Sequence, residues 1–282
     1  MNKSKTILCA RVFGGIGNQL FIYAFSRALA IGNNCDLVFD TTSGFLFDNY
    51  KRKPKINLYA KFVKSASLLM LLIFYLSKYL PLIFGKIFKA KICAESDFRS
   101  LYKFDEQDII NYKYIYLQGY FQSYLYFNNY ANQIRSEVRL NFTKSNLINN
   151  IAAKIQNTNA VSIHVRRLEY SDLLTLDYYK QAIDIIEKNV SNPNYFIYSD
   201  DISWCKANFA GFVDLNYVEH DGLDEVADLW LMTQCKHHII ANSSYSWWGA
   251  WLSTHQKKII VAPKDTQIGV KGHFYPNDWI QI

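Results

Sequence analysis

The sequence predicts an α/β protein made of two Rossmann-like halves that face a cleft. Strand-like apolar runs alternate with helical runs in both halves of the chain, and this alternation is typical of parallel βαβ units. With 282 residues, 50% of them hydrophobic, the chain can bury two cores, and disorder is excluded. We expect one domain at 1–150, with a basic and irregular insertion at about 45–110, and a second domain at 151–282.

The first half begins as a strand, a glycine turn and a helix. Thr6–Val12 is rich in β-forming residues, glycines within 14–17 interrupt it, and apolar residues then recur on one helical face across 20–29. Asp36–Asp40 and Tyr112–Leu117 have the composition of two further strands.

The second half alternates more regularly. Apolar runs bounded by turn residues predict strands, and residues with a helical repeat predict the helices between them. The expected strands are 160–165, 195–199, 238–241 and 258–262, and the expected helices are 176–188, 202–208, 223–231 and 244–253.

Positive charge is concentrated in one segment. Lys51–Lys91 contains ten basic residues and no acidic one, so this segment carries a charge of +10. Because the net charge of the chain is +7, the remaining residues together carry −3. It also contains nine unbroken apolar residues, Leu68–Leu76, too few to span a bilayer. Two interpretations remain: a helix lying in an anionic membrane surface, or a core helix with solvated lysines.

The five cysteines form no CxxC pair, and Lys3 and Lys5 lead directly into a strand rather than an apolar leader. We therefore expect a reducing, cytoplasmic location in which the thiols are small core residues.

A glycine turn opens the first predicted helix. Gly15 and Gly17 precede Asn18 and Gln19 in a partial dinucleotide fingerprint, which requires glycine where Leu20 stands. An NAD-dependent oxidoreductase is therefore the weaker alternative. The turn can present backbone N–H groups and two amide side chains to a ligand, or it is a purely structural turn.

Two arginines follow the strand that ends near His164. The carboxyl edge of an open α/β sheet is where ligands bind, and adjacent guanidinium groups there suit a diphosphate. We expect His164, Arg166 and Arg167 in such a site; the alternative is a surface ion pair with Glu169 or Asp172.

Two further segments reach the same predicted edge. Asp200 can accept a hydrogen bond from a ribose or base, while Asp201 is expected as a helix N-cap. The serine-rich turn is expected to combine helix capping with phosphate binding, and the tryptophans behind it are expected in the core. The turn residues expected at the ligand are Asn242, Ser243, Ser244 and Ser246.

Metal chemistry finds little support in the sequence. His237 and His238 are adjacent on a strand and point in opposite directions, and neither an Asp-x-Asp motif nor a nucleophile elbow is present. We expect no metal and no other cofactor.

Five ordered motifs carry a family resemblance: residues 14–21 (GGIGNQLF), 119–123 (GYFQS), 164–167 (HVRR), 198–201 (YSDD) and 235–252 (CKHHIIANSSYSWWGAWL). The set resembles the bacterial α-1,2-fucosyltransferases of glycosyltransferase family 11, across nearly the whole chain except the insertion. The resemblance implies a GT-B architecture with an acceptor-side first domain and a nucleotide-sugar-binding second domain. It also implies that GDP-fucose is the donor and that the anomeric configuration inverts without a metal ion.

By this resemblance, the paired arginines hold the GDP diphosphate together with the serine turn, and Asn18 and Gln19 lie across the cleft. Arg167 stabilises the leaving group. Leu168 and Glu169 stand where the family has glycine and aspartate, so Glu169 is the expected base.

The implied reaction moves L-fucose from GDP-β-L-fucose to the 2-hydroxyl of a terminal β-galactoside during surface-glycan (O-antigen) synthesis. A lipid-linked acceptor and a peripheral position on the inner face of the cytoplasmic membrane are options; no nucleic acid partner is expected. A non-catalytic, membrane-surface carbohydrate-binding protein is the other alternative, although it leaves Arg166 and Arg167 unexplained.

Overall fold

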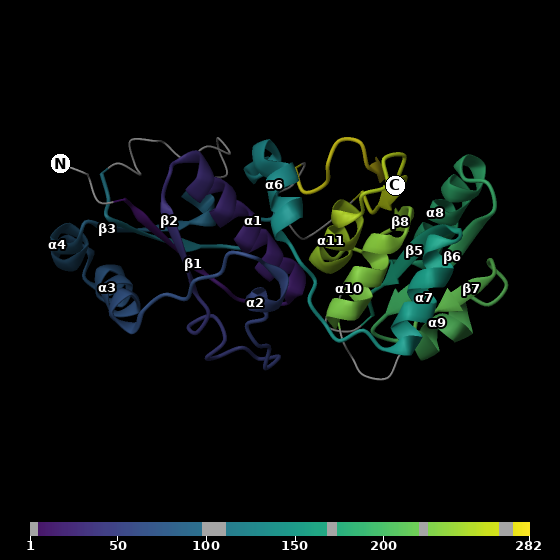
Figure 1. The fold of residues 1–282 in the computed structure, drawn as a ribbon, viewed down its shortest axis with the longest axis horizontal. Helices are drawn as coiled ribbons and strands as arrows, with labels where there is room; N and C mark the ends of the chain where they lie inside the picture. Colours follow the sequence, from purple (N-terminus) through teal and green to yellow (C-terminus); the bar gives the residue numbers. More distant parts are fainter. Residues whose placement is uncertain (1–4, 98–110, 168–173, 220–224, 265–272) are drawn as a thin grey trace. The chain divides into compact units, whose positions relative to one another are not determined.

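The structure, a computed structural model, describes residues 5–97, 111–167, 174–219, 225–264 and 273–282. The chain forms two compact units (Figure 1). The first comprises Met1–Arg139 with Gly272–Phe274, and the second comprises Leu140–Lys271 with Tyr275–Ile282.

The predicted domain boundary after residue 150 is misplaced. It falls inside helix α7 (Asn146–Gln156), which belongs to the second unit and packs on strand β5 and helix α10. Ile148, Ala152 and Ile155 form the buried face of α7. The sequence analysis overlooked this amphipathic repeat, so the boundary lies one helix earlier, at residues 139 and 140.

The first unit contains a four-stranded parallel sheet in the order β2-β1-β4-β3. Three strands match the prediction closely: β1 (Ile7–Arg11), β2 (Asp36–Asp40) and β4 (Tyr114–Gln118). The fourth, β3 (Ala90–Ala94), lies inside the predicted insertion and pairs along the whole of β4. The prediction of an irregular insertion is therefore wrong for residues 90–94. Lys91 interrupts the apolar residues there, so the sequence shows no clear strand pattern.

The two faces of this sheet carry different helices. Side chains alternate along a strand, so Leu8 and Ala10 share one face while Cys9 lies on the other. Helix α1 (Ile16–Gly32) packs on β1 and β2, and helix α3 (Leu68–Tyr79) packs its Phe74 against Cys9. The remaining helical elements are α2 (Ile56–Tyr59), η1 (Pro81–Gly85), α4 (Lys86–Phe88), η2 (Glu95–Asp97), η3 (Tyr124–Tyr126), η4 (Asn128–Tyr130) and α6 (Ala131–Glu137).

Helix α3, which contains the apolar run, is buried on one face and exposed on the other. Ile73, Phe74 and Ser77 are buried on the sheet side, whereas Leu68, Leu72 and other apolar residues of the helix are exposed. Within the described residues, no helix has the length and apolar composition needed to cross a bilayer.

The second unit contains a six-stranded parallel sheet in the order β10-β9-β8-β5-β6-β7. Four strands were predicted: β5 (Asn159–Val165), β6 (Pro193–Ser199), β8 (His237–Ile239) and β9 (Ile260–Ala262). The edge strands β7 (Leu215–Tyr217) and β10 (Ile280–Gln281) were not, because Asn216 interrupts the apolar residues of β7 and β10 has only two residues. The other helices are α8 (Leu176–Asn189), α9 (Ile202–Asn208), α10 (Glu225–Gln234) and α11 (Ser244–Leu252).

Two apolar clusters hold the second sheet between its helices. Tyr179 and Ile186 of α8 pack on Val161 and Ile163 of β5, and Met232 of α10 joins α7 in the other cluster. All five cysteines are free thiols and four of them are buried, which confirms their expected role as small core residues.

Candidate functional site

The topology of the second sheet fixes where a ligand can approach. Strands β6 and β7 follow β5 in order towards one edge of the sheet. The chain then crosses back, and β8 pairs with β5 on its other side. Ligands of open α/β sheets bind at this reversal, outside the carboxyl ends of the two diverging strands. Here those ends lead into Arg166–Arg167 after β5 and into 240–243 before α11.

Asp200 organises the arginine loop. Its Oδ1 accepts a hydrogen bond from the backbone N–H of Arg167 at 2.8 Å, and its Oδ2 lies 3.1 Å from the Arg166 guanidinium. Arg166 thus forms an ion pair with Asp200. Glu169 and Asp172, the partners that the sequence analysis considered, lie outside the described part of the chain. Because both carboxylate oxygens of Asp200 contact the loop, this residue positions the two arginines.

Arg167 is held flat against an aromatic ring. Its guanidinium carbon lies 3.9 Å from the ring centroid of Trp204, and its Nε is buried without a hydrogen-bond partner among the described residues. Stacking fixes the plane of the guanidinium while leaving its edge donors for a planar anion. A buried unsatisfied donor costs about 1–3 kcal/mol, so this arrangement favours an external acceptor.

Trp204 is a residue that the sequence analysis missed. It lies three positions after Asp201, whose side chain caps α9 by accepting from the Trp204 N–H at 2.9 Å. The predicted cap is confirmed. The sequence signal that could have identified Trp204 was an aromatic residue in the first turn of the predicted helix 202–208.

His164 lies at the end of β5 beneath the loop. Only 5% of it is exposed, its ring centroid lies 5.5 Å from that of Tyr245, and its Nδ1 has no hydrogen-bond partner in the described structure. Burial, and secondarily the charge of Arg166, lower the pKa of His164 to about 3. At neutral pH the imidazole is uncharged, so the arginines alone among these three residues supply positive charge.

Two serines of the turn have structural roles. Ser243 caps α11, because its Oγ accepts from the Tyr245 N–H at 3.2 Å, and the buried Ser246 donates to the Ser243 carbonyl at 3.4 Å. Asn242 and Ser244 are only partly buried. The N-terminus of α11 presents backbone N–H groups at this turn, and such donors suit a phosphate. The expected core position of the tryptophans is confirmed, since Trp247 and Trp248 are fully buried.

In the first unit, the glycine turn needs Gly14 rather than the glycines that were singled out. Gly14 has φ +77°, and a Cβ there would lie 2.8 Å from Asn18 Nδ2. Gly15 is the N-cap of α1 and has open space around it, whereas Gly17 is buried inside the helix. Asn18 is partly exposed, and its Oδ1 accepts from Gln122 at 2.7 Å.

The Gln19 side chain joins two backbone segments, which corrects the expectation that it lies at the ligand. Its Nε2 donates to the carbonyls of Gly14 (2.9 Å) and Lys53 (3.1 Å), and its Oε1 accepts from the Lys55 N–H at 2.9 Å. The side chain is 1% exposed, so its amide ties the segment at 53–55 to the glycine turn.

A cavity of about 350 Å³ lies at the carboxyl edge of the first sheet, on the α3 side. Asp40 forms its buried polar floor and accepts from Tyr116 Oη at 2.6 Å and from Ser43. Arg11 in turn donates to Ser43 Oγ at 3.1 Å, and Leu72 of α3 contributes to an apolar wall. The sequence analysis did not identify this cluster, whose members come from four separate segments.

Among the described residues, no group of three His, Cys, Asp or Glu side chains could hold a metal ion. His237 and His238 bond to different partners, as their alternation predicts: His237 Nδ1 accepts from the Ile259 N–H and His238 Nδ1 pairs with Ser162.

The parallel sheets of both units, with a cationic loop at the reversal of the second, define a GT-B glycosyltransferase. The solved structure of the fucosyltransferase NodZ from Bradyrhizobium superposes with a TM-score of 0.56 at 14% identity, over 88% of this chain and 92% of that one. The protein belongs to glycosyl transferase family 11, whose model matches residues 8–282.

Two curated relatives from Escherichia coli match over nearly their full length. The chain is 31% identical to an alpha-1,2-colitosyltransferase over 92% of its own residues and 91% of that protein. It is also 31% identical to the O-antigen biosynthesis glycosyltransferase WbnK, over 95% and 98% respectively.

The buried neutral histidine makes stability depend on pH. The unfolded chain protonates His164 below its ordinary pKa of 6.5, but the folded protein does so only near 3. The free energy of unfolding therefore falls as the pH drops from 6.5 towards 3, by about 1.4 kcal/mol per pH unit for this group. We expect His164→Asn to reduce the slope of stability against pH in denaturant titrations. The exposed His273→Asn serves as control, and equal slopes for both variants would contradict the assignment.

Proposed function

We propose that the protein transfers L-fucose from GDP-β-L-fucose to the 2-hydroxyl of a terminal β-galactoside. The observation that carries this proposal is the loop of Arg166 and Arg167, held by Asp200 and stacked on Trp204 at the reversal of the second sheet. Family membership and the relatives support it, since one is an alpha-1,2-transferase and the other acts in O-antigen biosynthesis.

In the proposed reaction the bond between the anomeric carbon and the diphosphate oxygen breaks as the sugar gains oxocarbenium character. The guanidinium groups neutralise the charge that develops on the departing diphosphate, which is where preorganised donors contribute most. The acceptor hydroxyl attacks from the opposite face, so the configuration inverts. Glu169 stays the proposed base that removes the hydroxyl proton late in this step.

We propose that the reaction needs no metal and no other cofactor. The support is the chemistry of the donor site, where two permanently charged guanidinium groups can take the role that a divalent cation has in other diphosphate-releasing enzymes. His164, neutral at working pH, contributes no charge.

We place the acceptor in the first unit. The 350 Å³ cavity supports this assignment, because its polar floor around Asp40 and its apolar wall from α3 suit a sugar attached to a less polar carrier. A galactoside-ended, lipid-linked oligosaccharide would have both properties. The protein would then work on the cytoplasmic side of the membrane, with no nucleic acid partner.

The decisive experiment is incubation with GDP-fucose and a panel of galactoside acceptors, with the product linkage determined by nuclear magnetic resonance. We expect an α-1,2-linked product and the same rate with EDTA present. Binding is measured separately: GDP in hundredfold excess over its Kd raises the melting temperature by about 5 °C, and NAD does not. Stabilisation by NAD would favour an oxidoreductase, and absence of any nucleotide response would favour a non-catalytic binding protein.

A second donor is favoured by one specific observation. The relative at 31% identity is named for colitose, which is L-fucose without its 3-hydroxyl. Assaying GDP-fucose and GDP-colitose at equal concentration separates the two donors. A site that hydrogen-bonds the 3-hydroxyl rejects the deoxy sugar strongly, whereas a site without such a contact accepts both.

A further inference from the structure

The first unit exposes an unusual amount of apolar surface along α3, η1 and α4. Leu68 is 84% exposed and Leu82 is 78% exposed, and neither belongs to a buried cluster. The other large apolar residues exposed in this segment are Leu69, Leu72, Tyr75, Tyr79, Leu80, Ile83 and Ile87. Contiguous apolar surface of this kind marks a place where a protein meets another molecule or a membrane.

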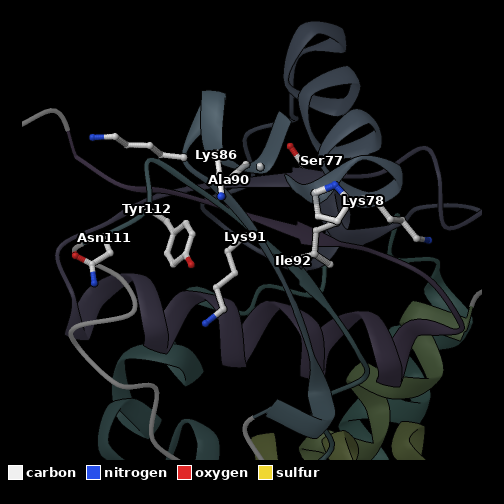
Figure 2. A pocket seen from close by; sticks show the side chains of 11 residues that line it. Ser77, Lys78, Lys86, Ala90, Lys91, Ile92, Asn111 and Tyr112 are labelled. Carbon is white, nitrogen blue, oxygen red and sulfur yellow. The ribbon is translucent and has the colours of Figure 1, made fainter. Parts of the chain in front are cut away.

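A lysine-lined cavity lies next to this surface (Figure 2). It has a volume of about 630 Å³ and lies between the end of α3, η1, α4, the start of β3 and residues 111–112. Its cationic lining residues are Lys78, Lys86, Lys89 and Lys91. Figure 2 labels Lys78, Lys86 and Lys91. Of the described residues that line it, none is acidic, in keeping with the absence of acidic residues from 51–91.

The wall of the cavity also contains an unsatisfied buried hydroxyl. Ser77 is 4% exposed, and its Oγ has no hydrogen-bond partner in the described structure. Asn111 and Tyr112 contribute further polar groups, and Lys91 Nζ lies 5.5 Å from the Tyr112 ring centroid. A cavity with four ammonium groups and a buried hydroxyl without a partner has the chemistry of a phosphate site.

We infer that the segment from α3 to α4 docks on an anionic phospholipid bilayer, with a lipid phosphate in the lysine cavity and the apolar residues in the acyl boundary. Charge and apolarity together select this occupant. A soluble phosphate ester would use the lysines but leave Leu82 and its neighbours in water, and an uncharged partner would offer no counter-charge to Lys86 and Lys89. The inference deepens the peripheral location suggested under the proposed function.

The test is co-sedimentation of the full-length protein with vesicles, without donor or acceptor. We expect binding to phosphatidylglycerol mixed with phosphatidylcholine, weaker binding at higher salt, and little binding to phosphatidylcholine alone. Lys86→Glu/Lys89→Glu should lower the partition coefficient by about 30-fold or more, given roughly 1 kcal/mol for each basic residue at an anionic surface. The control, Lys188→Glu/Lys257→Glu, makes the same charge change at exposed positions of the second unit and should bind normally.

Two further variants separate the parts of the site. Leu82→Ser/Ile83→Ser should reduce binding while leaving its salt dependence intact, because apolar insertion is lost and the charge is retained. Ser77→Ala should weaken binding about fivefold without lowering the melting temperature, because it removes a hydroxyl that has no partner among the described residues.

Three results would overturn the inference. They are equal binding to neutral vesicles, equal loss in the charge-matched control, or full displacement by free glycerol phosphate. Because no sugar nucleotide is present, this test can fail while fucosyl transfer succeeds, and the reverse also holds.

Discussion

Arg167→Ala is expected to lower kcat/KM by more than about 100-fold, comparable to the loss of a main oxyanion donor. The guanidinium lies 3.9 Å from the Trp204 ring centroid, and its buried Nε has no acceptor among the described residues, so we expect it to donate to the leaving diphosphate. Lysine retains the charge but neither the planar fork nor the stacking. Arg167→Lys should therefore recover only part of the activity, as measured by steady-state kinetics with varied GDP-fucose.

The control for this prediction is Lys206→Ala on the same helix as Trp204. Lys206 is exposed and pairs with Glu219, so its removal should leave turnover within about twofold. If Arg167→Ala turned over normally, the arginine loop would not be the diphosphate site, and the proposed function would lose the observation that carries it.

Asp200→Ala is expected to have the second largest effect, a loss of about 10- to 100-fold in kcat/KM. This loss does not require contact between the carboxylate and GDP-fucose, because Asp200 holds both the Arg167 N–H and the Arg166 guanidinium. Releasing both removes the preorganisation on which charge stabilisation depends. We expect the KM for GDP-fucose and the Kd for GDP to rise together, which a general loss of stability would not produce.

Asp200→Asn should lie between the wild type and Asp200→Ala. Its side-chain oxygen can still accept from the Arg167 N–H, whereas the charge that holds Arg166 is gone. Asp201→Asn is the neighbouring control, since asparagine also caps a helix and the Asp201 side chain accepts from the Trp204 N–H of α9. If all three variants bound GDP equally well, Asp200 would not be a positioning residue.

Long elements with a regular pattern were predictable. Strands β1, β2, β5 and β6 and helix α8 lie within two residues of their expected limits, because burial on a sheet imposes apolar runs on the sequence. Strand β3, which pairs along β4, was missed because it lies in a basic segment and Lys91 interrupts its apolar residues.

For the site, the sequence was more informative about residue types than about roles. Adjacent arginines after a strand indicated an anion site, and the structure places them where open sheets bind ligands. Gln19 looked the same as Asn18 in the sequence, yet its amide is consumed by two carbonyls and one N–H from segments far along the chain. Such partners come together only after the chain has folded.

Local features could be read from the sequence: the alternation of strands and helices, the positive charge of 51–91 and the motifs that place the chain in family 11. The partners of the polar atoms became visible only in the folded protein. It pairs Asp200 with both arginine positions, stacks Arg167 on Trp204, and brings Ser77 and four lysines to the lining of one cavity. The physical reason is that hydrogen bonding and burial depend on distances between residues remote in sequence, which no local pattern encodes.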